Sequence, residues 1–155
     1  MDGNFKEIVE TLHHSYERLL AMAPVKIGDL PSNMAKAGIY LFSEGNHHLY
    51  VGRTNRMRQR LNEHARPSSP HNLASFAFRL AREATGRISA SYVSDGSRSH
   101  LENDPNFKEA FIAEKKRVRS MDVRFVEEAD PLKQALLEIY VSVVLRTPHN
   151  DFDTH

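Results

Sequence analysis

The chain has 155 residues, a length that suits one ordinary domain with a hydrophobic core. Hydrophobic residues make up 40% and charged residues 26% of it, which is typical of a globular protein and excludes a disordered one. The formal net charge is +1. No apolar run reaches about 18 residues, which excludes a membrane span, and the absence of cysteine excludes disulfides, thiolate zinc sites and cysteine nucleophiles.

The first half of the chain predicts a helix, a β-hairpin and two further helices. Apolar residues recur at helical spacing over residues 4–22. Two β-prone runs, 38–42 and 49–51, are separated by turn residues and therefore predict an antiparallel hairpin. A helix follows the second run, and a further helical stripe covers residues 73–84.

The second half predicts a loop, two helices and a third strand. Residues 86–104 are rich in Gly, Ser, Asp and Asn and predict a long loop, after which 106–119 has helical character. Residues 122–126 alternate polar and apolar side chains, as in a strand with one buried face. Asp130 and Pro131 have the residue types of a helix cap and first turn, and the helix that they begin runs to about residue 145.

This last predicted helix is apolar on almost all sides, so we expect it to be buried. Glu138 is the only charged residue in the run 135–145. Because burial of an unpaired carboxylate is strongly unfavourable, a buried Glu138 requires an arginine or a hard cation such as Mg²⁺. The simpler alternative is a glutamate at the solvent edge of a buried helix.

Several residue types used in phosphoryl transfer lie in or near the hairpin. Tyr40 and Tyr50 are on its adjacent strands, and we expect them on one side of it, with Glu138 on a helix facing them. Arg60 lies on the following helix, and His64 is one turn further along the same face. Phenol, guanidinium, imidazole and carboxylate groups can bind phosphate, accept a proton or hold a metal. Taken singly, each residue has an ordinary explanation in packing or solvation.

Cationic residues gather directly after the hairpin. Between residues 53 and 66 a single acid, Glu63, accompanies five arginines, which are Arg53, Arg56, Arg58, Arg60 and Arg66. A nucleic-acid-binding protein needs a local cationic surface and not a cationic total. We therefore expect Arg53, Arg56, Arg58 and Arg66 to bind nucleic acid.

The hairpin resembles the signature of the GIY-YIG nuclease family. Gly38-Ile39-Tyr40 is followed by Tyr50-Val51-Gly52, with valine in place of the usual isoleucine. The similarity continues through Arg53, Asn55, Arg60-Leu61 and His64, and resumes at Glu138 and Asn150, so that it covers about 36–65 and 122–152. An ordered set of this many matches in suitable predicted elements is a specific signal.

The resemblance implies an α/β (α+β) GIY-YIG fold, with a three-stranded antiparallel sheet flanked by helices. It implies one domain over 1–155, with an N-terminal helical extension (1–34) and a helical and loop insertion (67–120) before the third strand. The resemblance also implies a role for each matched site residue. Tyr40 and Tyr50 correspond to the signature tyrosines, Arg60 to the catalytic arginine and Glu138 to the metal ligand. His64 corresponds to a position that carries Tyr or His in relatives, and Asn150 to an asparagine that helps to organise the site.

The activity that the resemblance implies is endonucleolytic hydrolysis of DNA, with one Mg²⁺ or Mn²⁺ ion per site. A phenol, with Tyr40 favoured, or His64 would accept the proton of the attacking water. Two alternatives stay open, a non-catalytic nucleic-acid-binding module and a protein-interaction module that retain the fold. RNA is a possible substrate, and a protein partner or a second copy could bind the N-terminal helix. The absence of cysteine and of a membrane span fits a cytoplasmic location.

Overall fold

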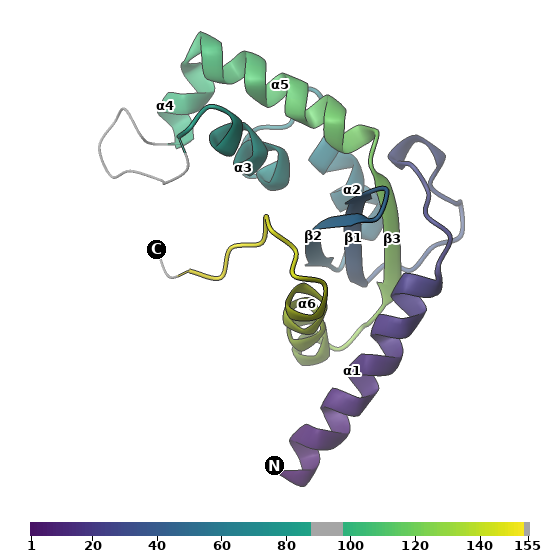
Figure 1. Cartoon of the computed structure of the whole chain (residues 1–155). Coiled ribbons are helices and arrows are strands. Elements are labelled where there is room, and N and C mark those ends of the chain that lie inside the picture. The colour runs from purple at the N-terminus through teal and green to yellow at the C-terminus, as the bar shows by residue number, and fades with distance from the viewer. Residues whose placement is uncertain (88–97, 154–155) are drawn as a thin grey trace. The chain divides into compact units, whose positions relative to one another are not determined.

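The computed structural model describes residues 1–87 and 98–153 (Figure 1). Its contacts divide the chain into two compact units. The first unit comprises Met1–Arg58 and Asp122–His155, and the second comprises Gln59–Met121. Each unit has its own packed interior and is described by itself below.

An antiparallel sheet of three strands forms the centre of the first unit. Strands β1 (Gly38–Glu44), β2 (His47–Thr54) and β3 (Asp122–Glu127) lie in the order β2-β1-β3 (Figure 1). The hairpin and the third strand are thus confirmed, and with the flanking helices they form the α+β fold expected from the sequence.

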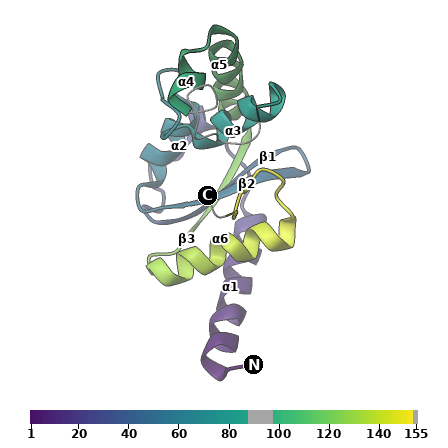
Figure 2. The same ribbon diagram turned by 90° about the vertical axis from the view of Figure 1, so that its left-hand side faces the viewer.

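Helices α1 (Gly3–Ala21) and α6 (Pro131–Leu145) cover one face of this sheet. Helix α6 packs against β2 and β1, α1 packs against β3, and the two helices touch each other where they cross (Figure 2). Every second strand residue faces them. The resulting core consists of Leu12, Leu19, Ile39, Leu41, Val51, Val126, Leu137 and Val141.

The outer edge of β3 is closed by the segment that leaves α1. Val25 and Val123 exchange two backbone hydrogen bonds, of 3.0 and 2.8 Å, in an isolated antiparallel bridge. The short 3-10 helix η1 (Ile27–Asp29) follows, with Ile27 buried. Because an open strand edge invites pairing with another chain, this bridge protects one side of the sheet.

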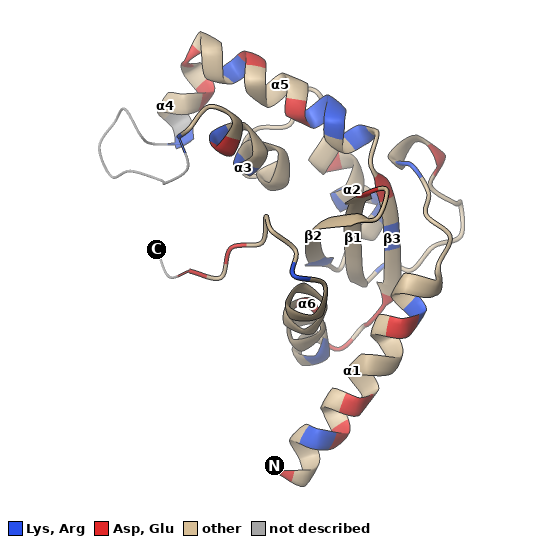
Figure 3. Ribbon diagram, viewed as in Figure 1, with Lys and Arg blue, Asp and Glu red and all other residues tan. Residues whose placement is uncertain are grey.

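The expectation that α6 is buried on all sides is wrong. Leu137 and Val141 are fully buried, whereas Leu132, Ile139 and Val143 on the opposite side are 60%, 46% and 66% exposed. Figure 3 shows that charged residues are rare along this helix. A uniformly apolar helix can be buried only where other elements surround it, and here the sheet and α1 contact only part of it.

The second unit is helical. Helix α2 (Met57–Ala65) begins at the end of the first unit, and α3 (Ser75–Ala84), α4 (Arg98–Asn103) and α5 (Pro105–Arg119) follow. Phe78 of α3 packs edge-on against Phe107 and Phe111 of α5, with ring centroids 5.1 and 5.4 Å apart. The expected helices over 73–84 and 106–119 are therefore confirmed, and α3 and α5 pack together.

The predicted loop over 86–104 is wrong for residues 98–103, which form α4, while residues 88–97 lie outside the described part of the chain. Asp104 and Pro105 separate α4 from α5 and begin α5, where the aspartate side chain accepts hydrogen bonds from the backbone N–H groups of Asn106 and Phe107. Asp130 and Pro131 begin α6 in the same way, as predicted.

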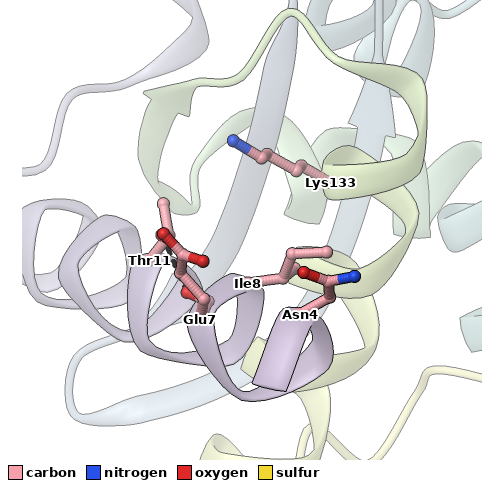
Figure 4. Close-up of a pocket in the computed structure, with 5 residues that line it drawn as sticks. All are labelled: Asn4, Glu7, Ile8, Thr11 and Lys133. Atoms are coloured by element: carbon pink, nitrogen blue, oxygen red, sulfur yellow. Dashed lines mark hydrogen bonds between the residues drawn. The ribbon is translucent and has the colours of Figure 1, made fainter. Parts of the chain in front are cut away.

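A shallow hollow of about 390 Å³ lies between the N-terminal half of α1 and the start of α6. Asn4, Glu7, Ile8 and Thr11 line it from α1, and Lys133 lines it from α6 (Figure 4). None of the expected site residues borders it. Among residues 1–87 and 98–153, no helix combines the length and the apolar character needed to cross a bilayer.

Candidate active site

The two glycines of the hairpin motif are each required by a close contact. A Cβ atom on Gly38 would lie 1.9 Å from the carbonyl oxygen of Val126 in β3. A Cβ atom on Gly52 would lie 2.2 Å from the hydroxyl oxygen of Tyr40. Gly38 thus permits the close approach of β1 and β3, and Gly52 leaves room for the phenol ring that lies over it.

Tyr40 and Tyr50 project from the same face of the sheet, as expected. The register pairs Tyr40 with Gly52 and Phe42 with Tyr50, and residues paired across a hairpin share a face. Tyr40 is 1% exposed and packs edge-on against Phe42, whereas Tyr50 is partly exposed. The ring of Tyr40 crosses from the central strand over the edge strand β2, so its hydroxyl group lies at Gly52.

Glu138 does not lie on a helix that faces these tyrosines, so this expectation is wrong. Leu137 and Val141 of α6 pack with Ile39, Leu41 and Val51, which alternate with the tyrosines and therefore project from the opposite face. Sequence periodicity correctly placed the two tyrosines together, but it carries no information about which face a distant helix covers.

Glu138 instead meets the end of β2 through Arg53. Its carboxylate accepts a hydrogen bond from the backbone N–H of Arg53, and the Arg53 Nε atom lies 4.0 Å from its Oε1 atom. The side chain of Glu138 is 22% exposed. Burial raises the pKa of the Glu138 carboxyl, against the opposing effects of the Arg53 guanidinium and backbone N–H. Glu138 is therefore a partly buried carboxylate with an arginine nearby and one side open to solvent.

Asn150 closes the outer edge of β2 in the middle of the second motif. The backbone N–H of Val51 donates to its Oδ1 atom over 2.9 Å, and its Nδ2 atom donates to the Val51 carbonyl over 2.7 Å. The side-chain amide thus acts as the peptide group of an additional strand. Thr147 also donates to Oδ1 over 2.8 Å and is hydrogen-bonded to Ser142 of α6, which ties the helix end to β2.

We predict that Asn150→Asp lowers the unfolding free energy by about 1–3 kcal/mol, the typical effect of leaving a buried partner without its hydrogen bond. The carboxylate can still accept from the Val51 N–H, but it cannot donate to the Val51 carbonyl. Thermal melting and hydrogen exchange at the Val51 amide measure the effect. Asn72→Ala, a change at an exposed asparagine in the second unit, is the control. An unchanged melting temperature for Asn150→Asp would refute the bidentate contact.

Arg60 and His64 belong to the second unit. Arg60 donates from Nη1 to the carbonyl of Leu73 over 2.7 Å and from Nη2 to the hydroxyl of Ser75 over 3.1 Å, and its Nη1 atom is 3.6 Å from Glu63. These contacts hold the guanidinium in one orientation. Of its five N–H donors, the two hydrogen bonds use two.

His64 lies one helical turn after Arg60 and is completely buried. Burial, and then the positive charge of Arg60, lower the pKa of the His64 imidazole well below 6.5. The ring is consequently neutral at physiological pH and can accept a proton.

The remaining arginines of the segment 53–66 are exposed, namely Arg53, Arg56, Arg58 and Arg66. Arg53 is half exposed while it contacts Glu138, and Arg58 donates a hydrogen bond to the carbonyl of Pro31. Their exposure makes them accessible to an anionic polymer, and the binding of nucleic acid by these arginines stays a prediction.

The protein groups around Glu138 determine which divalent cation could bind there. No group of three or more His, Asp or Glu side chains suited to a metal occurs in the part of the chain that the structure describes. Mg²⁺ fits a site with a single carboxylate because it prefers oxygen and usually keeps several of its waters. The raised pKa of Glu138 shows that its negative charge lacks full compensation, which a cation would provide.

The first unit combines an α+β fold with a glycine-spaced tyrosine hairpin and a partly buried carboxylate, and the comparison with protein families agrees with this fold and hairpin. The model of the GIY-YIG catalytic domain matches residues 36–119, more than half of the chain. The chain belongs to the GIY-YIG family, a family of nucleases. No curated protein and no solved structure matches it.

The match includes Tyr40, Tyr50, Arg53, Arg60 and His64, and it ends before Glu138 and Asn150. It also runs through α3, α4 and all of α5, the segment that the sequence predicted to be an insertion. Sequence patterns do not indicate Ser142 and Thr147, which hold Asn150, or Ser75, which holds Arg60. Isolated hydroxyl residues have no distinctive pattern, so only the structure reveals these contacts.

Proposed function

We propose that this protein is a divalent-metal-dependent endonuclease that hydrolyses phosphodiester bonds of DNA. The observation that carries the proposal is the arrangement at the edge strand β2, where the second motif is bordered by Glu138, Tyr40 and Asn150. Family membership supports the reaction class, because GIY-YIG nucleases act on DNA and generally require a divalent metal.

Glu138 would hold the metal, Mg²⁺ or Mn²⁺, through its carboxylate. A bound divalent ion supplies positive charge that stabilises a pentavalent phosphorus and the leaving 3′-oxygen. Asn150 would keep Tyr50, Val51 and Gly52 in place by its two hydrogen bonds with the strand edge. The N–H of Arg53 would fix the orientation of the Glu138 carboxylate.

Arg60 would bind the non-bridging phosphate oxygens with the N–H groups that its internal hydrogen bonds leave available. A guanidinium held in one orientation before substrate arrives needs little reorganisation, which is the condition for effective charge stabilisation. Tyr50, the accessible phenol of the pair, would contact a phosphate group of the DNA by hydrogen bonding.

His64 is the proton acceptor that we favour over Tyr40. A phenolate at Tyr40 would need neighbouring cations, and the Arg53 side chain projects from the opposite face of the sheet. The His64 imidazole is already neutral, and negative charge on a bound phosphate would offset the repulsion from Arg60 that disfavours its protonation.

We therefore predict a cleavage rate that changes less than about twofold between pH 6.5 and 8.5 under single-turnover conditions. The pKa of His64 is lowered well below 6.5, so the base is already deprotonated throughout this interval. A phenol with a reference pKa near 10 would instead give a rise of about tenfold per pH unit. If such a rise persisted in His64→Gln and were absent in Tyr40→Phe, Tyr40 and not His64 would be the proton acceptor.

Arg56 and Arg58 are predicted to contribute to the electrostatic contact with DNA. Reversing both charges should weaken binding and reduce the slope of log K against log salt concentration by about two, since each phosphate contact contributes about 0.9. Lys6→Glu combined with Arg18→Glu makes the same charge change on α1 and serves as the control. Equal slopes for all three proteins would place DNA elsewhere, for instance along the exposed Lys116 and Arg119 of α5.

The experiment that tests the proposed function is incubation with supercoiled, linear, branched and single-stranded DNA, and with RNA, in Mg²⁺, Mn²⁺ or EDTA. We expect metal-dependent cleavage of at least one DNA substrate and none in EDTA. Binding without cleavage in either metal would favour the non-catalytic nucleic-acid-binding module, and neither binding nor cleavage would favour a protein-interaction module. Faster cleavage of RNA would change the substrate class. The cysteine-free composition supports a reducing, cytoplasmic setting as part of the same proposal.

A further inference from the structure

The outer side of α6 is an apolar surface on a helix whose inner side completes the core of the first unit. Leu132, Ile139 and Val143 are 60%, 46% and 66% exposed. Leu136 lies between them in the sequence and is partly buried, because it also packs against the core of the first unit. Their spacing of four, three and four residues is that of a coiled-coil seam. Figure 2 shows α6 along its length, with α1 crossing it on another side. We refer to these four residues as the α6 seam.

We propose that the α6 seam pairs with the seam of a second copy of this chain in an antiparallel, two-fold symmetric dimer. A two-fold axis between Leu136 and Ile139 brings Leu132 of one copy beside Val143 of the other and places the two middle residues together. Leu132, Ile139 and Val143 of each copy then leave water, together with the exposed part of Leu136, in the way that paired amphipathic helices associate.

The charges at the two ends of α6 complement each other in this arrangement. Glu128 and Asp130 precede the seam, and Arg146 follows it, three residues after Val143. Antiparallel pairing about that axis places Arg146 of one copy opposite Ala129 of the other copy. Ala129 lies between Glu128 and Asp130 in the sequence, so the arginine is brought near both acids. A parallel pair would instead bring like charges together at each end. The self-complementarity of the surface is the reason for choosing a second copy as the occupant over an unrelated protein.

The N-terminal helix is less suited to this role, although its sequence suggested a partner. Leu12 and Leu19 of α1 are buried in the core of the first unit, and His13 is hydrogen-bonded to Tyr140 over 2.7 Å. The apolar side of α1 is therefore used within the chain, whereas three of the four residues of the α6 seam, Leu132, Ile139 and Val143, remain exposed. The proposal concerns association alone and does not depend on nuclease activity.

Sedimentation velocity over a concentration series tests the proposal with the full chain. We expect a reversible monomer–dimer equilibrium, weakened at least about 100-fold by Ile139→Asp, because two-fold symmetry introduces the buried charge twice. Ile112→Asp changes an isoleucine on α5 that is 40% exposed, and it should leave the equilibrium unchanged. Thermal melting of all three proteins establishes that each variant is folded.

Charge reversal tests the antiparallel register separately. Arg146→Glu should weaken self-association because the introduced glutamate faces Glu128 and Asp130 of the other copy. Ala129→Lys should weaken it because the introduced lysine faces Arg146. An equimolar mixture of the two variants should form a heterodimer more readily than either variant self-associates, because the introduced glutamate of one chain then meets the introduced lysine of the other.

Three results would overturn the proposal. A wild-type chain that stays monomeric at the highest concentration measured would leave the seam to a different partner. Equal association of wild type and Ile139→Asp would move the contact away from α6. Absence of preferential heterodimer formation in the charge-reversal mixture would exclude the antiparallel register. None of these results bears on cleavage, so the proposed function would stand or fall by its own test.

Discussion

Replacing Glu138 with glutamine is expected to abolish metal binding and to reduce DNA cleavage by at least about 10²–10³-fold, the usual effect of removing a preorganised electrostatic group. Glutamine retains the shape of the side chain and can still accept the hydrogen bond from the Arg53 N–H, but it has no charge with which to hold a divalent ion. Metal titration and single-turnover cleavage on the same preparations measure both effects.

The same substitution should raise the melting temperature of the metal-free protein at neutral pH. Burial raises the pKa of Glu138 above its unfolded value, so this carboxyl favours folding only below the unfolded pKa, and that contribution is lost as pH rises through the folded pKa. The ionised form is therefore held at a cost to stability at pH 7, which glutamine removes. The difference in melting temperature should shrink as the pH falls through the folded pKa of Glu138, and it should disappear below the unfolded value of 4.5. Mg²⁺ should raise the melting temperature of the wild type alone.

Glu127→Gln is the matched control, because Glu127 is an exposed carboxylate at the end of β3 in the same unit. It should leave metal binding, melting and cleavage unchanged. Cleavage by Glu138→Gln at the rate of the wild type would show that this carboxylate is not the metal ligand, and the proposed mechanism would then lose its central group.

Arg60→Ala is the second substitution with a large expected effect, a loss of about 10²–10³-fold in cleavage with metal binding preserved. Alanine removes the guanidinium that would bind the phosphate oxygens in the transition state. It also removes the hydrogen bond to the Leu73 carbonyl, so we expect a loss of about 1–3 kcal/mol in unfolding free energy. Cleavage is therefore measured at a temperature at which circular dichroism shows the variant to be folded.

Ser75→Ala separates the catalytic effect of Arg60 from its structural effect. It removes one hydrogen bond of the guanidinium and leaves the charge in place, so cleavage should fall much less than in Arg60→Ala. A similar loss in the two variants would mean that Arg60 acts by supporting the second unit. A rate in Arg60→Ala near that of the wild type would remove this residue from the proposed reaction.

The order of helices and strands could be predicted from local sequence because each element has a local cause. Alternation identified β3, helical spacing identified α1, and Asp130 with Pro131 marked the start of α6. The tyrosines of the hairpin share a face because their register follows from the short turn between the strands. These features depend on residues close together in the chain.

The errors concern contacts between distant residues. Apolar composition could not show that only one side of α6 meets the sheet, because that depends on how many elements surround the helix. Apolar composition also could not show that Glu138 reaches β2 beside Arg53, on the face of the sheet opposite to the tyrosines. The amide of Asn150 forms its hydrogen bonds with Val51, ninety-nine residues earlier in the chain, and no local pattern indicates a contact of that range.

The most direct test of the central claim, metal-dependent hydrolysis of DNA, is cleavage of a duplex in water enriched in oxygen-18, followed by mass spectrometry of the products. Direct attack by water with departure of the 3′-oxygen predicts a 3′-hydroxyl and a 5′-phosphate that carries one oxygen-18 atom. We expect this product with Mg²⁺ and no product with EDTA. A cleaved 5′-phosphate without the label, or equal cleavage with EDTA, would contradict the account.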